Sequence, residues 1–491
     1  MAAIRWVCVS DLHLGALNSV LTSVHADGDR VDQSSASPVL EALCDCLREL
    51  RVGQDPPQLV VLGDLFELAL SSTDDAAATF AYLVKAMRPG STDAAVSPGI
   101  RFLPGNHDHH LWSRARGDCY VDYMTGVPRG QALLPEPSAT HLLPANDTFR
   151  VRDRIVELMA ARTETDAPVT VEQSYPNLGL TDAAGRRVVV LSHGHFIEPL
   201  YQAMSALDDV FDHGPQGPRT VHDLEAENGA WIDFFWSSMG DSGSVAGWSR
   251  ALYESLQSED AISAEITAIR RAIRRAPGPK VLRHVESLVV GGMLRQATKS
   301  SLRRERHVPG ILSPAATTGL TDYLSGPVRA QVADEVGQAE AVTFVFGHTH
   351  KPFGDIRTLP GLPGPVGVVN TGGWVVDTPV AEPYKGATVV LVDEDLNVAL
   401  FHCYRQGQGS AAAVRIDGPD AGGTNPLVDD LRARIDTDRD PWRALADAAT
   451  EVERERRRQL SGRVQAETRL LDDAGGDAPA TPAPMSGEGT A

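Results

Sequence analysis

The chain has 491 residues, of which 42% are hydrophobic, and a formal net charge of −20 at pH 7. This length suits one large elaborated domain or two to three smaller ones. The negative charge argues against bulk attraction to nucleic acid or to an anionic membrane, and no apolar stretch is long enough to span a bilayer. The sequence opens on an expected strand rather than on a charged and apolar leader, and its five cysteines lack metal-site spacing. We therefore expect reduced thiols and a cytoplasmic location.

Five short apolar runs are each followed by a motif of polar residues that can bind metals. The runs cover residues 4–9, 59–62, 100–103, 188–191 and 342–346 and have the composition of buried strands. The motifs that follow them are Asp11-Leu12-His13, Gly63-Asp64, Gly105-Asn106-His107-Asp108, Ser192-His193-Gly194-His195 and Gly347-His348-Thr349-His350. Ligands of open α/β sheets gather beyond the carboxyl ends of the strands. Five successive strands that each end in such a motif therefore indicate one metal site rather than ordinary polar loops.

Helical patterns alternate with these strands. A long loop is expected over 16–37, a helix from Pro38 to about Leu50, and a second helix over 74–88. Residues 109–185 are mixed, with a helix near 150–162. The alternation predicts a layered α/β core over 1–198, which resumes over 341–405 with strands at 366–370, 388–392 and 398–404.

Between these two parts, residues 199–340 show helical periodicity. Ile262, Ile266, Ile269 and Ile273 recur at helical spacing. Since the last metal motif comes afterwards, we interpret this stretch as a helical insertion into the core. We assign its aromatic cluster to the interior of the insertion rather than to lipid contact: Trp231, Phe234, Phe235 and Trp236.

A C-terminal extension is expected over 406–471. Asp440-Pro441 starts a charged helix that runs to about Leu471, and we interpret it as a solvated or oligomer-forming helix. Residues 472–491 have the composition of a disordered tail.

The order of the motifs resembles that of the calcineurin-like metallophosphoesterase superfamily. Within it, Ser10-Asp11-Leu12-His13-Leu14-Gly15 and Gly63-Asp64-Leu65-Phe66-Glu67 resemble the bacterial branch that includes UDP-2,3-diacylglucosamine diphosphatase. The stretch between the fourth and fifth motifs does not resemble that branch. The resemblance implies an αββα sandwich and hydrolysis of phosphate-ester or pyrophosphate bonds.

The resemblance also implies a centre of two divalent cations. Its ligands would be Asp11, His13 and His350 for one cation, Asn106, His193 and His348 for the other, and Asp64 as the bridge. Two cations about 3.5–4 Å apart can clamp the attacking and leaving oxygens of an in-line displacement at phosphorus. The implied nucleophile is a hydroxide that bridges the metals. The nitrogen and oxygen ligands are compatible with Mn, Fe, Zn or Co, and we expect Mn²⁺.

His107 follows the ligand Asn106 and, by the same resemblance, would assist the leaving group. Its chemistry fits a general acid, with Asp108 orienting the ring. The resembling branch often carries Arg at this position, and an Arg cannot donate a proton at neutral pH. The histidine therefore favours a broader phosphoesterase mechanism.

Other polar residues beside the motifs have two readings each. His195 either contacts and supports a metal ligand, which we favour, or binds a metal ion itself. Asn370 to Trp374 either closes the site, as in the resembling branch, or forms a strand-ending turn with permissive glycines. His195 and Asn370 are thus candidates for substrate contact. We interpret His109 and His110 as a solvated loop pair rather than as substrate contacts.

Residues 270–306 form a basic cluster with eleven Lys or Arg residues against two acidic ones, a local net charge of +9. A solvated helical face is the simpler reading. Alternatively, Arg270, Arg271, Arg274 and Arg275 would hold an anionic substrate, or the segment would contact an anionic membrane peripherally.

These observations predict a metal-dependent hydrolase of a phosphorylated small molecule, a nucleotide or a lipid-linked substrate. The enzymatic alternatives are a cyclic-nucleotide phosphodiesterase, a nuclease and a phosphoprotein phosphatase, and the net charge disfavours the nuclease. The non-enzymatic alternative is a binding scaffold that kept the fold. Such a scaffold should lack a ligand, whereas this sequence retains every expected ligand.

Overall fold

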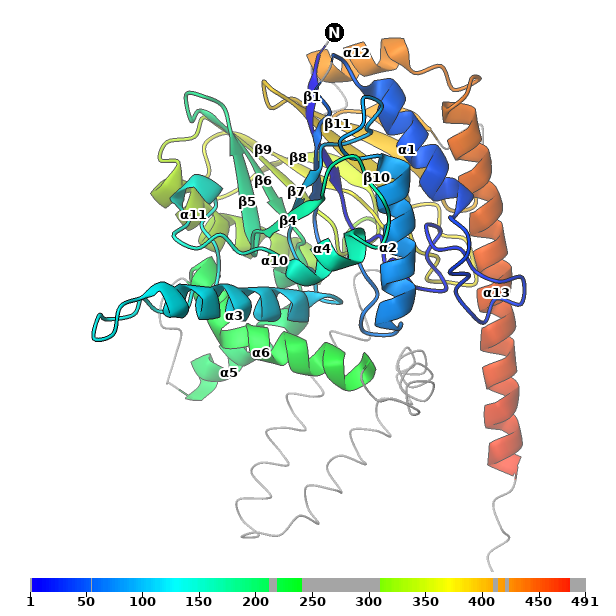
Figure 1. The fold of residues 1–491 in the computed structure, drawn as a ribbon, viewed down its shortest axis with the longest axis horizontal. Helices are drawn as coiled ribbons and strands as arrows, with labels where there is room; N and C mark the ends of the chain where they lie inside the picture. The colour runs from blue at the N-terminus through cyan, green and yellow to red at the C-terminus, as the bar shows by residue number, and fades with distance from the viewer. Residues whose placement is uncertain are drawn as a thin grey trace, which may run out of the picture.

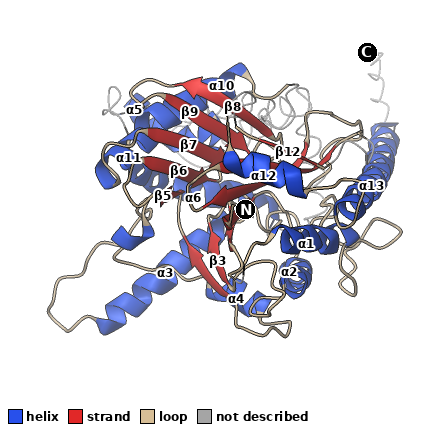
Figure 2. Cartoon of the chain, turned by 90° about the horizontal axis from the view of Figure 1, so that it is seen from above, coloured by secondary structure: helices blue, strands red, loops and turns tan. Residues whose placement is uncertain are grey.

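Two mixed β-sheets form the centre of the molecule (Figures 1 and 2). The computed structural model describes residues 2–53, 55–211, 219–240, 310–408, 414–419 and 424–476. Within these residues the first sheet has the order β12 (Arg415–Asp417), β11 (Val398–Arg405), β10 (Gly386–Asp393), β1 (Ile4–Val9), β2 (Gln58–Val61), β3 (Gly99–Phe102), β4 (Thr170–Gln173). The second has the order β5 (Asn177–Thr181), β6 (Arg187–Ser192), β7 (Ala341–Phe346), β9 (Pro365–Asn370), β8 (Phe353–Thr358).

Parallel pairing brings the predicted metal loops to common sheet edges. β1, β2 and β3 are parallel neighbours in the first sheet, and β6 and β7 are parallel neighbours in the second. The strands predicted from the sequence recur within about two residues of their expected bounds. The β10–β11 hairpin is antiparallel, and β10 also pairs antiparallel with β1.

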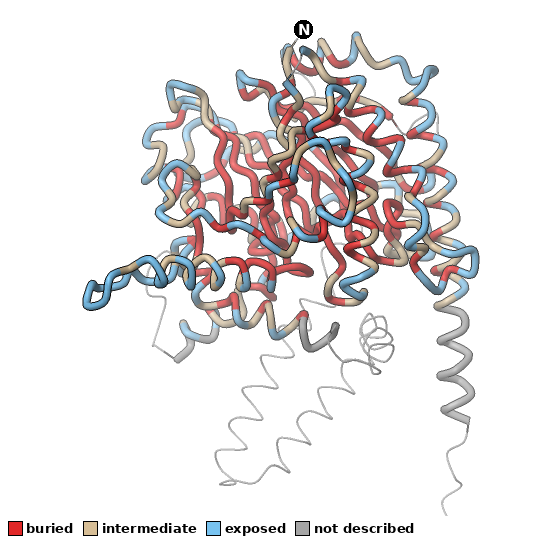
Figure 3. The backbone as a smooth tube through the Cα atoms, viewed as in Figure 1, coloured by how far each residue is buried: buried red, intermediate tan, exposed pale blue. Residues whose placement is uncertain are grey.

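The two sheets pack face to face through an apolar layer. Cys8 and Val60 of the first sheet share one buried cluster with Val189 and Val345 of the second. Because successive side chains of a strand point to opposite faces, the neighbouring positions pack outward against helices. In Figure 3 the buried residues gather in the middle of the molecule, where Figure 1 shows the two sheets. The prediction of a layered α/β sandwich is confirmed at this level.

Helices cover the outer face of the seven-stranded sheet. They are α1 (Pro38–Leu50), α2 (Thr73–Met87), α4 (Arg154–Ala160), α12 (Pro426–Arg434) and α13 (Trp442–Gly476). The bounds of α1 match the prediction, because Ser37 caps the helix and Pro38 occupies its first turn.

The interpretation of the C-terminal helix as solvated or oligomer-forming was wrong for its N-terminal part. Trp442, Leu445 and Ala449 are buried in the same apolar cluster as α1. The helix also continues to Gly476, so residues 472–476 are helical rather than part of a tail. Residues 477–491 lie outside the described part of the chain.

A second group of helices packs near the five-stranded sheet. It comprises α3 (His109–Gly126), α5 (Ala203–Phe211), α6 (Val221–Gly240), α10 (Pro314–Tyr323) and α11 (Arg329–Glu335). Trp112 of α3, Ile232 of α6 and Leu320 of α10 share a buried cluster with Val190 and Phe344 of the sheet. In Figure 1, α3 runs alongside α6.

Helix α3 was not predicted from the sequence. Its buried side chains, His109, Leu111, Trp112 and Ala115, lie only in its first turns, so the helix has no continuous apolar stripe. Among the described residues of 199–340 the structure has the helices α5, α6, α10 and α11, and the insertion itself stays a prediction. The expected helix around Ile262–Ile273 and the basic cluster at 270–306 lie outside the described residues. Among the helices that are described, none has both the length and the apolar character needed to cross a bilayer.

Candidate metal centre

Loops that follow five strands bring the seven predicted metal ligands together. Backbone hydrogen bonds connect these loops: the Asp11 N–H donates to Gly63 O and the His13 N–H to Asp64 O, both at 3.0 Å. The Gly347 N–H donates to His193 O at 3.0 Å, which joins the two loops of the second sheet. None of the seven predicted ligands is more than 8% exposed.

Left-handed backbone conformations are concentrated at these ligands. The φ angles are 51° at Asp11, 45° at His13, 50° at Asp64, 69° at His348 and 60° at His350. Among the other described non-glycine residues, only Arg88 and Leu396 have positive φ. Non-glycine residues rarely adopt this conformation, and such strain clusters at functional sites. The backbone is therefore shaped to aim these side chains.

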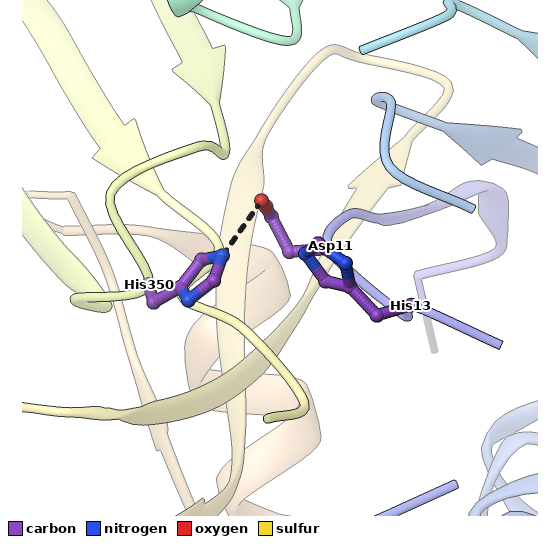
Figure 4. Close-up of side chains that lie close together, drawn as sticks. All are labelled: Asp11, His13 and His350. Atoms are coloured by element: carbon purple, nitrogen blue, oxygen red, sulfur yellow. Dashed lines mark ion pairs between the residues drawn. The ribbon is translucent and has the colours of Figure 1, made fainter. Parts of the chain in front are cut away.

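Asp11, His13 and His350 form the first group of converging ligand atoms (Figure 4). The Nε2 atom of His350 lies 3.2 Å from Oδ1 of Asp11. The buried Nε2 atom of His13 has no hydrogen-bond partner among the described residues. A buried nitrogen with no such partner is costly unless another group binds it. These residues therefore fit a cation-binding site.

A second group converges on His193. Its Nε2 atom lies 3.0 Å from Oδ1 of Asn106 and 3.2 Å from Nδ1 of His348. Oδ2 of Asp64 lies between the two groups, 3.6 Å from Nε2 of His13 and 3.6 Å from Nε2 of His193. The other oxygen of Asp64 accepts the His107 backbone N–H at 2.9 Å, which fixes the carboxylate. The carboxylate of Asp64 is thus shared between the two groups of ligand atoms.

Each of the four ligand histidines has its other ring nitrogen held by an oxygen atom of the protein. These contacts are His13 Nδ1 to Glu67 Oε2 at 2.8 Å, His193 Nδ1 to Leu62 O at 2.8 Å, His348 Nε2 to Glu198 Oε1 at 2.8 Å and His350 Nδ1 to Asp377 Oδ2 at 2.9 Å. A proton on the outer nitrogen leaves a lone pair on the inner one, which is the tautomer that metal binding requires.

The buried carboxylates favour positive charge in the centre. Burial alone would lower the pKa of His13, but Glu67, Asp64 and Asp11 outweigh burial and raise this pKa to about 9. Burial would also lower the pKa of His350, but the carboxylates of Asp377 and Asp11 outweigh burial and raise this pKa. The same field that favours an imidazolium proton attracts a divalent cation.

Glu67, rather than Asp108, orients the ring of His107. Oε1 of Glu67 lies 2.8 Å from Nδ1 of His107. Asp108 instead accepts backbone N–H groups, from Gly105 at 2.7 Å and from Leu65 at 2.8 Å. Its short side chain turns back onto the loops after β2 and β3, so the role predicted for it was wrong. The longer Glu67 reaches both His13 and His107, and its place in the Gly63–Glu67 motif was the available sequence signal.

The environment of His107 controls where its proton resides. Burial lowers the pKa of His107, although the Glu67 carboxylate opposes this shift. The contacts with His107 and His13 outweigh burial at Glu67 and hold the pKa of this carboxyl well below its usual value. The neutral ring therefore carries its proton on Nδ1, toward Glu67, and only the protonated ring can donate from Nε2.

His195 and Asn370 lie beside the ligands and are held by other protein groups. Nε2 of the buried His195 lies 3.0 Å from the Tyr175 hydroxyl, and its ring centroid is 5.4 Å from that of His193. Asn370 donates to Gly347 O at 2.6 Å and accepts the Gly372 N–H at 2.8 Å. Asn370 thereby joins the turn that ends β9 to the loop of His348 and His350, whereas the buried Nδ1 of His195 has no hydrogen-bond partner among the described residues.

His109 is not in a solvated loop, contrary to the sequence interpretation. It is 1% exposed and opens helix α3, where its Nδ1 lies 2.7 Å from Asp233 and its Nε2 lies 3.2 Å from Glu225. Both carboxylates belong to α6, and no sequence pattern indicates that this helix packs beside His109. Its neighbour His110 is exposed, as expected. The four predicted basic contacts lie outside the described residues: Arg270, Arg271, Arg274 and Arg275.

A small cavity of about 10 Å³ lies against the centre, with room for about one water. Asp64, His107 and His348 contribute to its wall, together with Tyr201 and Trp236 from the insertion. The aromatic cluster of the insertion is therefore divided: Trp236 is buried against the centre, whereas Phe234 is 63% exposed.

No protein-family model matches the sequence, and comparison with curated proteins gives no match. The functional assignment consequently depends on the residues and on their geometry.

Proposed function

We propose that the chain is a two-metal phosphoesterase that hydrolyses phosphate-ester or pyrophosphate bonds and has the four-layered fold of the calcineurin-like superfamily. One observation carries the proposal: Asp64 Oδ2 lies 3.6 Å from the inner nitrogens of His13 and His193, which belong to different ligand groups. A carboxylate shared by two nitrogen and oxygen ligand sets matches the requirements of a two-cation centre.

The residues present fit two divalent cations, and Mn²⁺ is our first expectation. The first would be held by Asp11, His13 and His350, and the second by Asn106, His193 and His348. When bound, the cations would supply Lewis acidity that activates water and neutralises charge developing on phosphorus oxygens. The protein supplies the fixed bridge at Asp64 and the outer contacts that keep each imidazole in the binding tautomer.

His107 is the proposed proton donor to the leaving oxygen. It follows Asn106 in the chain and lines the cavity together with Asp64, and Glu67 fixes its ring through Nδ1. The protonated ring donates from Nε2, and the Glu67 carboxylate stabilises its charge. Proton donation by a positioned side chain contributes about 10²–10⁴-fold to the rate.

A binding scaffold is the alternative from another functional class. Retention of all seven ligands, with five of them in left-handed backbone conformations, supports the enzyme over the scaffold. The test compares metal-free protein with and without added Mn²⁺ on bis-p-nitrophenyl phosphate and p-nitrophenyl phosphate. Mn²⁺-dependent release of p-nitrophenol is expected. A protein that binds Mn²⁺ but releases no product from these or from pyrophosphate substrates would favour the scaffold.

A further inference from the structure

Asp377 lies behind His350, outside every motif of the sequence. Its Oδ2 accepts the Nδ1–H of His350 at 2.9 Å, and its side chain is 7% exposed. The opposite ring nitrogen of His350 faces Asp11 at 3.2 Å. The carboxylate therefore fixes the direction in which His350 presents its inner lone pair.

The segment before Asp377 is fixed to the loop that carries Asp11. The Trp374 N–H donates to Asp11 O at 3.0 Å, and the Val376 N–H donates to Asn18 O at 2.9 Å. Trp374 and Val376 are fully buried. The position of Asp377 is consequently set relative to Asp11 before any cation binds.

Lys385 holds Asp377 from the other side. Its ammonium lies 2.9 Å from Glu382 and 3.5 Å from the same Asp377 oxygen that contacts His350, and it is 1% exposed. A buried ammonium is costly unless it is paired. The Lys385 carbonyl also accepts the Gln406 N–H at 3.0 Å, which ties the end of the segment to the chain after β11.

The second ligand group has a separate outer carboxylate. Glu198 contacts Nε2 of His348 at 2.8 Å and lies between the short helices at His195–Ile197 and Pro199–Gln202. Asp377 and Glu198 therefore support different cation sites from different parts of the fold.

We propose that Asp377, held by Lys385, is a positioning residue that sets the affinity of the cation bound by Asp11, His13 and His350 without setting that of the other cation. This inference rests on the proposed metal centre. An Asp377→Asn side chain keeps the size of the carboxylate but loses its charge and its strength as an acceptor. Loss of such an outer contact typically costs about 10–100-fold in metal affinity.

The experiment titrates the metal-free full chain with Mn²⁺ and measures two dissociation constants by calorimetry. Anomalous scattering from crystals at limiting Mn²⁺ assigns each constant to a site. Asp377→Asn should weaken binding about 10–100-fold at the site of His350 only. Glu198→Gln should weaken only the site of His348. Val380→Ser, at a position on the same segment that is 74% exposed, is the control and should bind as the wild type does.

Lys385→Met provides an independent variant should Asp377→Asn prove unfolded by circular dichroism. It should weaken the same site, because Asp377 loses its second contact. Equal weakening of both sites, or wild-type affinities in these two variants, would overturn the proposal. Failure of the wild type to bind two Mn²⁺ ions would instead overturn the metal centre and this inference with it.

Discussion

Trp236 of helix α6 lies over the imidazole of His107, with ring centroids 3.9 Å apart and ring planes inclined by 38°. The insertion thereby reaches the centre and helps to exclude water from the ring proposed to donate a proton. The same helix carries Asp233 and Glu225, which form ion pairs with His109, two residues after His107 in the chain. Helix α6 is thus joined to the third motif by one aromatic contact and to the start of α3 by two ion pairs.

Replacing Trp236 by Ala should open the cavity and admit water to His107. Because burial is what lowers the pKa of His107, this pKa should rise toward its ordinary value in the metal-free variant. Loss of the buried ring should also cost roughly 3–5 kcal/mol of unfolding free energy. NMR titration of His107 and urea unfolding measure the two effects. Trp236→Phe should retain most of both properties, and an unchanged His107 pKa in the Ala variant would contradict this account.

Asp64→Ala should abolish turnover and reduce bound metal, since the proposed bridge is shared by both ligand groups. Removing it leaves two cations with less negative charge between them, so their mutual repulsion increases. Elemental analysis after dialysis and initial rates with Mn²⁺ check the prediction. Full metal occupancy with normal rates would eliminate the assignment of Asp64 as the bridge.

His107→Ala should leave both cations bound while the rate falls roughly 10²–10⁴-fold. The loss should be smaller for substrates with good leaving groups, because their departing oxygen needs less protonation. A series of aryl phosphates with leaving groups of graded pKa measures this dependence. An equal loss across the series would remove the proton-donor role.

Glu67→Gln should differ from His107→Ala, because Glu67 contacts both His107 and the ligand His13. We expect about a 10–100-fold loss in metal affinity together with a loss in rate. Asp108→Asn is a suitable comparison, since it perturbs backbone hydrogen bonds without touching the His107 ring. The prediction fails if Glu67→Gln binds Mn²⁺ as tightly as the wild type and retains its rate.

His109 should make stability depend on pH. Burial would lower its pKa, but Glu225 and Asp233 outweigh burial and raise the pKa to about 10, above the ordinary value of 6.5. The folded state therefore holds the proton more tightly than the unfolded state. The stabilisation is fully present below pH 6.5 and is lost as pH rises toward 10, with a slope of at most about 1.4 kcal/mol per pH unit.

Chemical unfolding at a series of pH values between 6 and 10 measures this slope. His109→Gln should flatten the slope and lower stability on the order of 3–5 kcal/mol at neutral pH, since Glu225 and Asp233 lose a buried partner. A slope that is identical in the variant and the wild type would assign the dependence to another group.

Local sequence indicated eight of the twelve described strands, the first two helices and the five polar motifs at strand ends, whereas β4, β5, β8 and β12 were not predicted. Runs such as Ile4–Val9 specify buried strands because their apolar side chains can leave water only between layers. The polar residues directly after these runs, such as Asp11 and Asn106, must then lie at the carboxyl edge of a sheet. This consequence predicts a shared edge for the motifs, whereas the assignment of individual ligands came from the family resemblance.

Only the tertiary structure determines which protein groups contact the outer ring nitrogens of the ligand histidines. Asp377 follows the turn after β9, and Glu198 precedes the insertion, yet each contacts a histidine of the motif after β7. His109 is buried because α6 brings two carboxylates to it, and α13 packs on α1 although its sequence is highly charged. The energy of a buried charge depends on partners that are distant in the chain. No local pattern encodes those partners, so they emerge only when the layers pack.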